Sequence, residues 1–212
     1  MSPILHTTAI AAGGILAGLF LAGALLWWQQ QALQAARYEA SHDEITGLPN
    51  RRLFLTRLRA ALADRTPVGV VLLDLDRFKA VNDTFGHDTG NVLLEQVGRL
   101  LASMPTPVQI AARLSGDEFA LLVSGDDDDT AAAAHAAWQV IAAAPIRLDT
   151  GDIPVAASVG YTHTRDPHAS PRQLLAEADT AMYQAKGSGG GVCAYCPRGT
   201  PPQRRSRDRH YR

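Results

Sequence analysis

The sequence Arg-Leu-Ser-Gly-Asp-Glu-Phe at residues 113–119 decides how this chain folds and what it can bind. Apolar residues flank the stretch on both sides, so Asp117 and Glu118 fall at a turn between two predicted strands. A second apolar run, residues 68–75, carries Asp74 near its end and predicts a strand buried on both faces. Neighbouring strands that present carboxylates at one edge predict a site for hard divalent cations, which are often shared with substrate phosphates. The sequence therefore predicts a metal-dependent nucleotide enzyme.

Length and composition indicate one globular domain with appendages. The chain has 212 residues, of which 46% are hydrophobic, enough to bury a substantial core. Residues 197–212 carry six Arg and one Asp, a local charge of +5. A disordered basic tail of this kind can bind anionic lipid or nucleic acid, but its Pro, Gly and Arg content favours a solvated terminus without a partner. We therefore predict a disordered tail and no nucleic-acid partner.

The two cysteines form one Cys-x-x-Cys motif, Cys193 and Cys196. A zinc site normally needs four ligands, and the sequence has no second pair of cysteines. A thioredoxin-like pair would begin a helix after a strand, whereas this pair follows a run of glycines. The pattern favours free thiols.

The amino-terminal segment predicts a membrane anchor. Residues 8–28 contain no charged residue, and about twenty residues suffice to span the hydrocarbon core as a helix. A cleavable signal peptide is the alternative, but residues 1–7 lack the Lys or Arg that its basic region requires. We predict a retained single-pass anchor over residues 1–28 and a helical linker over residues 29–41. The basic residues that follow the span place the soluble domain on the cytoplasmic side of the inner membrane.

The soluble part alternates between helical and extended patterns. Helices are predicted at residues 51–64, 91–103, 130–144 and 172–185, and strands at 68–75, 108–114, 119–124, 146–148, 153–161 and 192–195. Residues 85–90 are predicted to form a loop, and the acidic run 126–129 to cap the helix that follows. This order predicts an α/β sandwich with a mixed central sheet flanked by helices.

Six pieces of the sequence together resemble the GGDEF family of diguanylate cyclases, with a domain over residues 42–196. The pieces lie at residues 42–52, 74–83, 85–90, 113–119, 157–160 and 178–186. The resemblance implies a nucleotide-cyclase-like α/β fold. It also implies a diguanylate cyclase that condenses two GTP molecules into cyclic di-GMP and releases pyrophosphate. Because each of two facing subunits holds one GTP, a homodimer is implied as well.

The same resemblance assigns roles to individual residues. The metal ligands would be Asp74, Asp117 and the carbonyl of Leu75, and the ion would be Mg²⁺ or Mn²⁺. Glu118 would be a further metal ligand or the group that helps to activate the attacking 3′-hydroxyl. The phosphates would be held by the backbone around Arg77 and Phe78 and by the side chains of Lys79 and Lys186. Asn82 would bind the guanine edge.

Several positions depart from the family pattern. Ser115 replaces the first Gly of the motif, and because Ser is small we expect little harm if the turn does not require positive φ. Asn91 stands where the family usually has an Asp that binds guanine, so a charge-assisted hydrogen bond is lost. Gly190 and Gly191 stand where the family has Arg and Asn, so one phosphate contact is missing.

The product-binding pattern Arg-x-x-Asp is also absent, because Thr106 and Gln109 occupy its positions. We therefore predict no product feedback of that type. The leading prediction is a membrane-anchored diguanylate cyclase. The alternative is a degenerate GTP-binding module that lacks catalysis and regulates a partner.

Overall fold

The computed structural model describes residues 3–148 and 151–197, and the chain divides into two units, residues 1–41 and 42–212. In the first unit, the predicted anchor and linker form one continuous helix, α1 (Pro3–Glu39). Within the described part of the chain, no helix combines the length and the apolar character needed to cross a membrane. The structure therefore does not support the anchor predicted for residues 1–28, of which residues 1–2 lie outside the described part. The predicted basic tail lies outside it from residue 198 onward.

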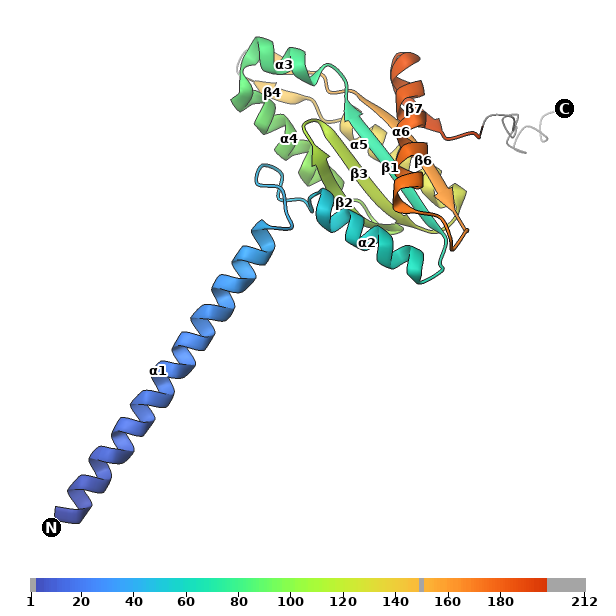
Figure 1. The fold of residues 1–212 in the computed structure, drawn as a ribbon. Helices are drawn as coiled ribbons and strands as arrows, with labels where there is room; N and C mark the ends of the chain where they lie inside the picture. The colour runs from blue at the N-terminus through green and yellow to red at the C-terminus, as the bar shows by residue number, and fades with distance from the viewer. Residues whose placement is uncertain (1–2, 149–150, 198–212) are drawn as a thin grey trace. The chain divides into compact units, whose positions relative to one another are not determined.

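The second unit is built on a five-stranded mixed sheet with the order β2-β3-β1-β6-β7 (Figure 1). Its strands are β1 (Val68–Leu75), β2 (Val108–Ser115), β3 (Glu118–Ser124), β6 (Ala157–Thr164) and β7 (Gly191–Ala194). β1 pairs antiparallel with both β3 and β6, and β7 is parallel to β6. A separate two-stranded sheet joins β4 (Ile146–Leu148) to β5 (Gly151–Ile153). The predicted mixed central sheet is confirmed.

Helices cover both faces of this sheet. One face packs against α2 (Arg51–Ala63) and α6 (Pro171–Gly187), and the other against α4 (His87–Ala102) and α5 (Asp127–Ala142). The alternation of β1 side chains produces the two layers, since Val70 and Leu72 face α2 and α6 while Val71 and Leu73 face α4 and α5. A strand buried on both faces needs apolar residues at every position, which explains its continuous apolar sequence.

The predicted loop at residues 85–90 is wrong. The helix α3 (Phe78–Phe85) ends at the start of this segment, and α4 begins at His87, so only Gly86 separates the two helices. Gly86 has a φ of 85°, which glycine adopts without strain and which lets the chain turn within one residue. The Thr89 hydroxyl donates a hydrogen bond to the Phe85 carbonyl across the junction. The many turn-forming residues of this segment predicted a loop, although two helices meet there.

Two other boundaries differ from the prediction. The single strand expected at residues 153–161 is two strands, because Pro154 lacks the backbone N–H that a continuous ladder requires. α5 begins three residues earlier than predicted, at Asp127. The Asp126 carboxylate accepts hydrogen bonds from the N–H groups of Asp128 and Asp129, which confirms the acidic run as a helix cap.

Gly160 lets α6 lie directly on the sheet. A Cβ atom at this position would overlap with the backbone of Met182 and Ala178, so no larger residue fits without moving the helix. The approach of α6 to β6 brings the last turn of the helix, with Lys186, to the edge where β1 ends.

Candidate active site

The strand register places carboxylates side by side at one edge of the sheet. Asp74 of β1 is the cross-strand partner of Glu118 in β3 and of Ser158 in β6. Cross-strand partners project to the same face of a sheet. Since Leu73 faces α4 and α5, the side chains of Asp74, Glu118 and Ser158 project toward α2 and α6. The structure thus brings Asp74 and Glu118 together, although they lie 44 positions apart along the chain.

Lys186 already supplies a cation to this edge. Its Nζ lies 2.7 Å from Oδ1 of Asp74, whose side chain is largely buried, whereas that of Lys186 is half exposed. The hydrogen bond to Asp74 raises the pKa of Lys186 and outweighs the opposing effect of burial. The ammonium group therefore stays charged and holds a carboxylate, whereas the family resemblance predicted a phosphate contact.

Asp117 lies in the turn between β2 and β3, and its carbonyl accepts a hydrogen bond of 3.3 Å from the N–H of Leu75 at the end of β1. Burial, followed by the negative charge of Asp74, raises the pKa of its carboxyl group, and the positive charge of Lys186 offsets this only in part. The edge thus carries more negative charge than its own lysine neutralises, which is the condition that favours binding of a further cation.

Ser115 contributes a hydrogen bond to the site. Its Oγ donates to Oε2 of Glu118 at 3.0 Å. In the described part of the chain, positive φ among non-glycine residues occurs at Arg65 and Arg77 only, so Ser115 meets no backbone penalty. The turn instead uses positive φ at Gly116. The small size of Ser115 predicted only that it would be tolerated in the turn, and this hydrogen bond to Glu118 was not predicted.

Asp76 braces the end of β1 against β6. Its Oδ1 accepts a hydrogen bond of 2.8 Å from the buried Ser158 hydroxyl, and its N–H donates to the Ala156 carbonyl. Gly190 lies close by with a φ of 99°, and a Cβ there would come within 3.2 Å of Oδ2 of Asp76. The glycine at position 190 is therefore suited to this backbone, and an Arg there would be strained.

The start of α3 offers backbone donors next to the carboxylates. Arg77 has a left-handed conformation with a φ of 60° and precedes the helix without capping it through its side chain. Phe78 is half-buried against the core, and Lys79 is exposed. An uncapped helix start of this kind favours anions, because its first N–H groups and the helix dipole point toward them.

Asn82 carries the unsatisfied acceptor next to this helix start. Its Oδ1 is buried and has no hydrogen-bond partner within the described residues. Gly90 of α4 packs against it so closely that a Cβ would overlap with the amide oxygen. Asn91, the next residue, is half-buried. The pair α3 and α4 thus presents amide groups that suit the N–H edge of a nucleobase.

The donor set also bears on metal binding. Among the described residues, no group of three or more His, Cys, Asp or Glu side chains is arranged to hold a metal ion by itself. Magnesium usually takes one or two carboxylates and completes its shell with phosphate oxygens and water. Asp74 and Asp117 supply two such carboxylates beside the buried end of β1 at Leu75. These residues fit a divalent ion that is shared with a phosphate ligand.

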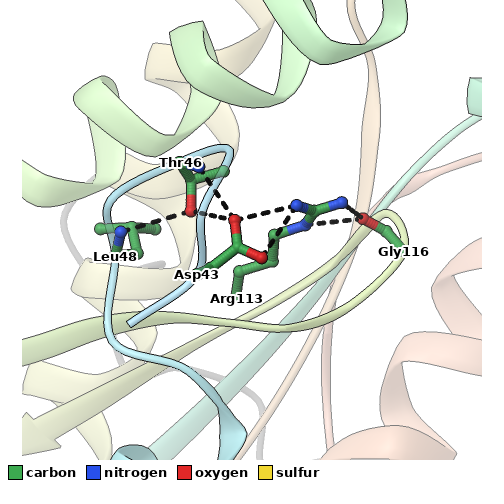
Figure 2. A network of polar contacts seen from close by, with 5 residues as sticks. All are labelled: Asp43, Thr46, Leu48, Arg113 and Gly116. Carbon is green, nitrogen blue, oxygen red and sulfur yellow. Dashed lines mark hydrogen bonds and ion pairs between the residues drawn. The ribbon is translucent and has the colours of Figure 1, made fainter. Parts of the chain in front are cut away.

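An ion-pair network holds the turn that carries Asp117 (Figure 2). Nη1 of Arg113 donates to both carboxylate oxygens of Asp43 at 2.9 and 3.0 Å. Nε and Nη2 of Arg113 donate to the Gly116 carbonyl at 2.9 and 2.7 Å. Asp43 also accepts hydrogen bonds from the N–H and hydroxyl of Thr46. Burial opposes the ionisation of Asp43, but the hydrogen bonds from Arg113 and Thr46 outweigh it and lower its pKa.

Sequence reasoning assigned no role to Asp43 or Arg113. A usable signal was present, because an Arg within an otherwise apolar strand requires a carboxylate or several carbonyls as partners. The partner itself lies 70 positions away, at the entrance to the domain, and no periodicity in the sequence points to it.

Comparison with known proteins identifies the domain. The family model described as diguanylate cyclase, GGDEF domain, matches residues 40–191. The chain therefore belongs to the GGDEF-domain family.

Individual relatives agree with this family. The diguanylate cyclase TpbB of Pseudomonas aeruginosa is 36% identical over 169 residues, covering 75% of this chain and 39% of the relative. The cyclic di-GMP phosphodiesterase PdeR of Escherichia coli is 35% identical over 182 residues, covering 84% of this chain and 28% of the relative. The solved coiled-coil and GGDEF domain of DgcB from Caulobacter crescentus, in complex with c-di-GMP, superposes with a TM-score of 0.78 at 26% identity. That superposition covers 85% of this chain and 98% of DgcB.

The chain spans between 22% and 39% of the length of these first curated relatives. Proteins named for synthesis of cyclic di-GMP and for its breakdown both contain the matching region. The family is therefore shown by similarity, whereas the activity of this chain has to be argued from its own residues.

The Arg113 network generates the first prediction. Replacing Arg113 with Met should lower the free energy of unfolding by about 3 kcal/mol, because the Asp43 carboxylate and the Gly116 carbonyl lose their donors. Denaturant unfolding followed by circular dichroism measures the change. The matched control Arg99→Met removes an exposed ion pair with Glu95 and should cost less than about 1 kcal/mol.

The pH dependence gives an independent check of the same network. In the wild type, the stabilisation from ionised Asp43 is complete above its ordinary pKa of 3.8 and is lost as the pH falls through its lowered value in the folded state. Arg113→Met should lose less stability over this acidic window, because its Asp43 has already lost the strongest partner. Equal losses of stability in acid for the two proteins, or a cost of Arg113→Met no larger than that of Arg99→Met, would contradict the stabilising role of the Arg113–Asp43 pair.

Proposed function

We propose that this chain is a diguanylate cyclase that condenses two GTP molecules into cyclic di-GMP as a dimer of facing domains. The observation that carries the proposal is the edge of the sheet where Asp74, Asp117 and Lys186 meet beside the uncapped start of α3. A mere scaffold has no need for a buried carboxylate paired with a lysine and a second carboxylate whose pKa is raised.

The residues divide the work of binding. Asp74 and Asp117, with the Leu75 carbonyl, would hold a divalent ion such as Mg²⁺ or Mn²⁺, which when bound offsets the charge of the triphosphate. The N–H groups around Arg77 and Phe78 and the Lys79 ammonium hold the phosphate oxygens. Lys186, whose Nζ contacts Asp74, would provide a further positive charge for the phosphates.

Base recognition and proton transfer fall to other side chains. The orphaned Oδ1 of Asn82 accepts from the guanine N–H edge, and Asn91 adds a neutral amide where an acid would bind more strongly. Glu118, held by the Ser115 hydroxyl, accepts the proton from the 3′-hydroxyl of the GTP on the facing subunit. That hydroxyl attacks the α-phosphate, and pyrophosphate leaves in line.

A non-catalytic GTP-binding module is the second candidate. Asn91 and the three glycines at residues 189–191 favour it, because all three glycines have positive φ and none offers a phosphate-binding side chain. The two functions differ in a single observable, since a module of this kind binds GTP and never converts it.

Membrane attachment belongs to the proposal on the strength of the sequence alone. Residues 8–28 are uncharged, and basic residues follow on one side. Attachment to the inner membrane would hold two domains at high local concentration, which the two-subunit reaction requires.

Activity is tested with residues 37–212, incubated with GTP and Mg²⁺ and fused to a dimerising helix. Cyclic di-GMP should form, and Asp117→Asn should lower the rate by at least about 100-fold. The same variant should be no less stable than the wild type at neutral pH. The reason is that burial raises the pKa of Asp117, so above that pKa the ionised carboxylate makes the folded state less stable.

The advantage of Asp117→Asn should shrink as the pH falls through the raised pKa, because the wild-type carboxyl then also becomes neutral. The matched control is Asp152→Asn, an exposed acid of β5 that should change neither property. GTP binding without any cyclic di-GMP, even in the dimerised protein, would establish the non-catalytic module instead.

The effect of Asn91 on the affinity for GTP can be measured separately. Asn91→Asp should lower the KM for GTP by about tenfold, corresponding to the ~1–2 kcal/mol of a charge-assisted hydrogen bond. Asn91→Ala serves as the control and should not lower KM. An unchanged or raised KM in Asn91→Asp would show that this position does not bind the base.

Membrane attachment predicts where the full chain is found in fractionated cells. The full chain should remain in the membrane pellet after an alkaline carbonate wash, and residues 37–212 should not. Recovery of the full chain in the soluble fraction would remove this part of the proposal and leave the catalytic part intact.

A further inference from the structure

A cavity of about 460 Å³ lies on the α2 and α6 face of the sheet, separate from the start of α3. Its walls come from α2 and α6, and β1 and β3 also line it (Figure 1 shows these four elements). Cavities between about 300 and 1,000 Å³ are the size that holds small organic ligands in proteins. Its volume therefore suits one small molecule.

Apolar side chains form part of the cavity lining. Leu55 of α2, Leu72 of β1, and Leu175 and Met182 of α6 contribute to its lining. Leu55 and Leu175 are only half-buried, although Leu175 packs against the buried core. Apolar side chains exposed inside a concavity gain free energy when an apolar ligand covers them.

The rim of the cavity is basic. Arg51, Arg59 and Arg172 line it, and none of the three forms an ion pair within the described residues. Two acids, Glu118 and Asp179, also contribute to the lining, so the arginines are in excess. Arg172 lies in the first turn of α6, where a positive side chain is unfavourable beside the positive end of the helix dipole. A bound anion would offset the excess positive charge of the arginines and the positive end of the helix dipole.

We propose that this cavity binds a small organic anion with an aromatic or branched apolar body. The leucines and Met182 would hold the body, and Arg59 and Arg172 would hold the anionic group. The Arg-rich segment at the end of this same chain is excluded as an occupant by its charge. An occupant would touch β3 at Glu118 and Phe119, next to the turn that carries Asp117.

The test uses the full chain and the fluorescent probe 8-anilinonaphthalene-1-sulfonate, with N-phenyl-1-naphthylamine as the uncharged analogue. We expect saturable binding of the sulfonate that Arg59→Met and Arg172→Met each weaken by about tenfold, as loss of a charged hydrogen-bond donor would. The uncharged analogue should bind all these proteins equally. Binding of the sulfonate should survive Arg59→Lys in large part, since the charge is kept.

Two control variants isolate the cavity. Arg57→Met removes a neighbouring exposed charge of α2 that does not line the cavity, and it should bind the sulfonate as the wild type does. Ala176→Phe adds a ring at an exposed lining position and should abolish the saturable component while leaving the thermal unfolding curve unchanged. Subtracting the fluorescence of the Ala176→Phe variant removes the contribution of probe bound elsewhere, including along α1.

Two results would overturn the proposal. One is equal affinity for the sulfonate in Arg59→Met, Arg172→Met and Arg57→Met, which would show that the rim does not recognise the anion. The other is competitive displacement of the probe by GTP and Mg²⁺, which would make the cavity part of the nucleotide site. Neither result depends on cyclase activity, so the proposal stands or falls independently of the function proposed above.

Discussion

The ion pair between Arg113 and Asp43 is the constraint on which the position of the turn that carries Asp117 depends. Arg113 is buried within β2 and donates hydrogen bonds to the Asp43 carboxylate and to the Gly116 carbonyl. The bond to Asp43 holds the segment at the start of the domain, and the bond to Gly116 holds the turn that carries Asp117. A buried guanidinium without these partners would be strongly unfavourable, so the segment around Asp43 and the turn that carries Asp117 adopt their positions together.

The electrostatics of the edge follow from how few positive charges the fold supplies there. Asp74, Asp117 and Glu118 converge, and Lys186 is the cation that the structure places in direct contact with Asp74. Burial, followed by the negative charge of Asp74, raises the pKa of Asp117, whereas the hydrogen bond to Asp74 is what chiefly raises the pKa of Lys186. Carboxylates gathered around a single lysine favour a ligand that brings cations with it.

Close packing of α6 on the sheet makes this arrangement possible. Gly160 removes the side chain that would hold the helix away, and the last turn of α6 then reaches the end of β1. The same helix forms one wall of the cavity between α2 and α6, and β3 lines that cavity with Glu118 and Phe119. α6 and β3 thus contribute both to the edge that carries the carboxylates and to the cavity.

The sequence by itself determined the mixed sheet sandwiched between helices and the pairing of acidic residues at the ends of two strands. Local patterns carry that information, because apolar periodicity and turn residues act over a few neighbouring positions. The short α3 escaped detection because its surroundings are rich in turn-forming residues, and Gly86 joins two helices where a loop was expected.

Only the tertiary structure decided which side chains meet. The contacts of Lys186 with Asp74, Ser158 with Asp76, and Arg113 with Asp43 join positions 112, 82 and 70 residues apart. Such contacts are set by the register of strands and by how closely a helix approaches a sheet, and neither leaves a periodic trace in the sequence. The residue types therefore predicted a site rich in carboxylates, whereas the pairing of Lys186 with Asp74 was known only from the structure.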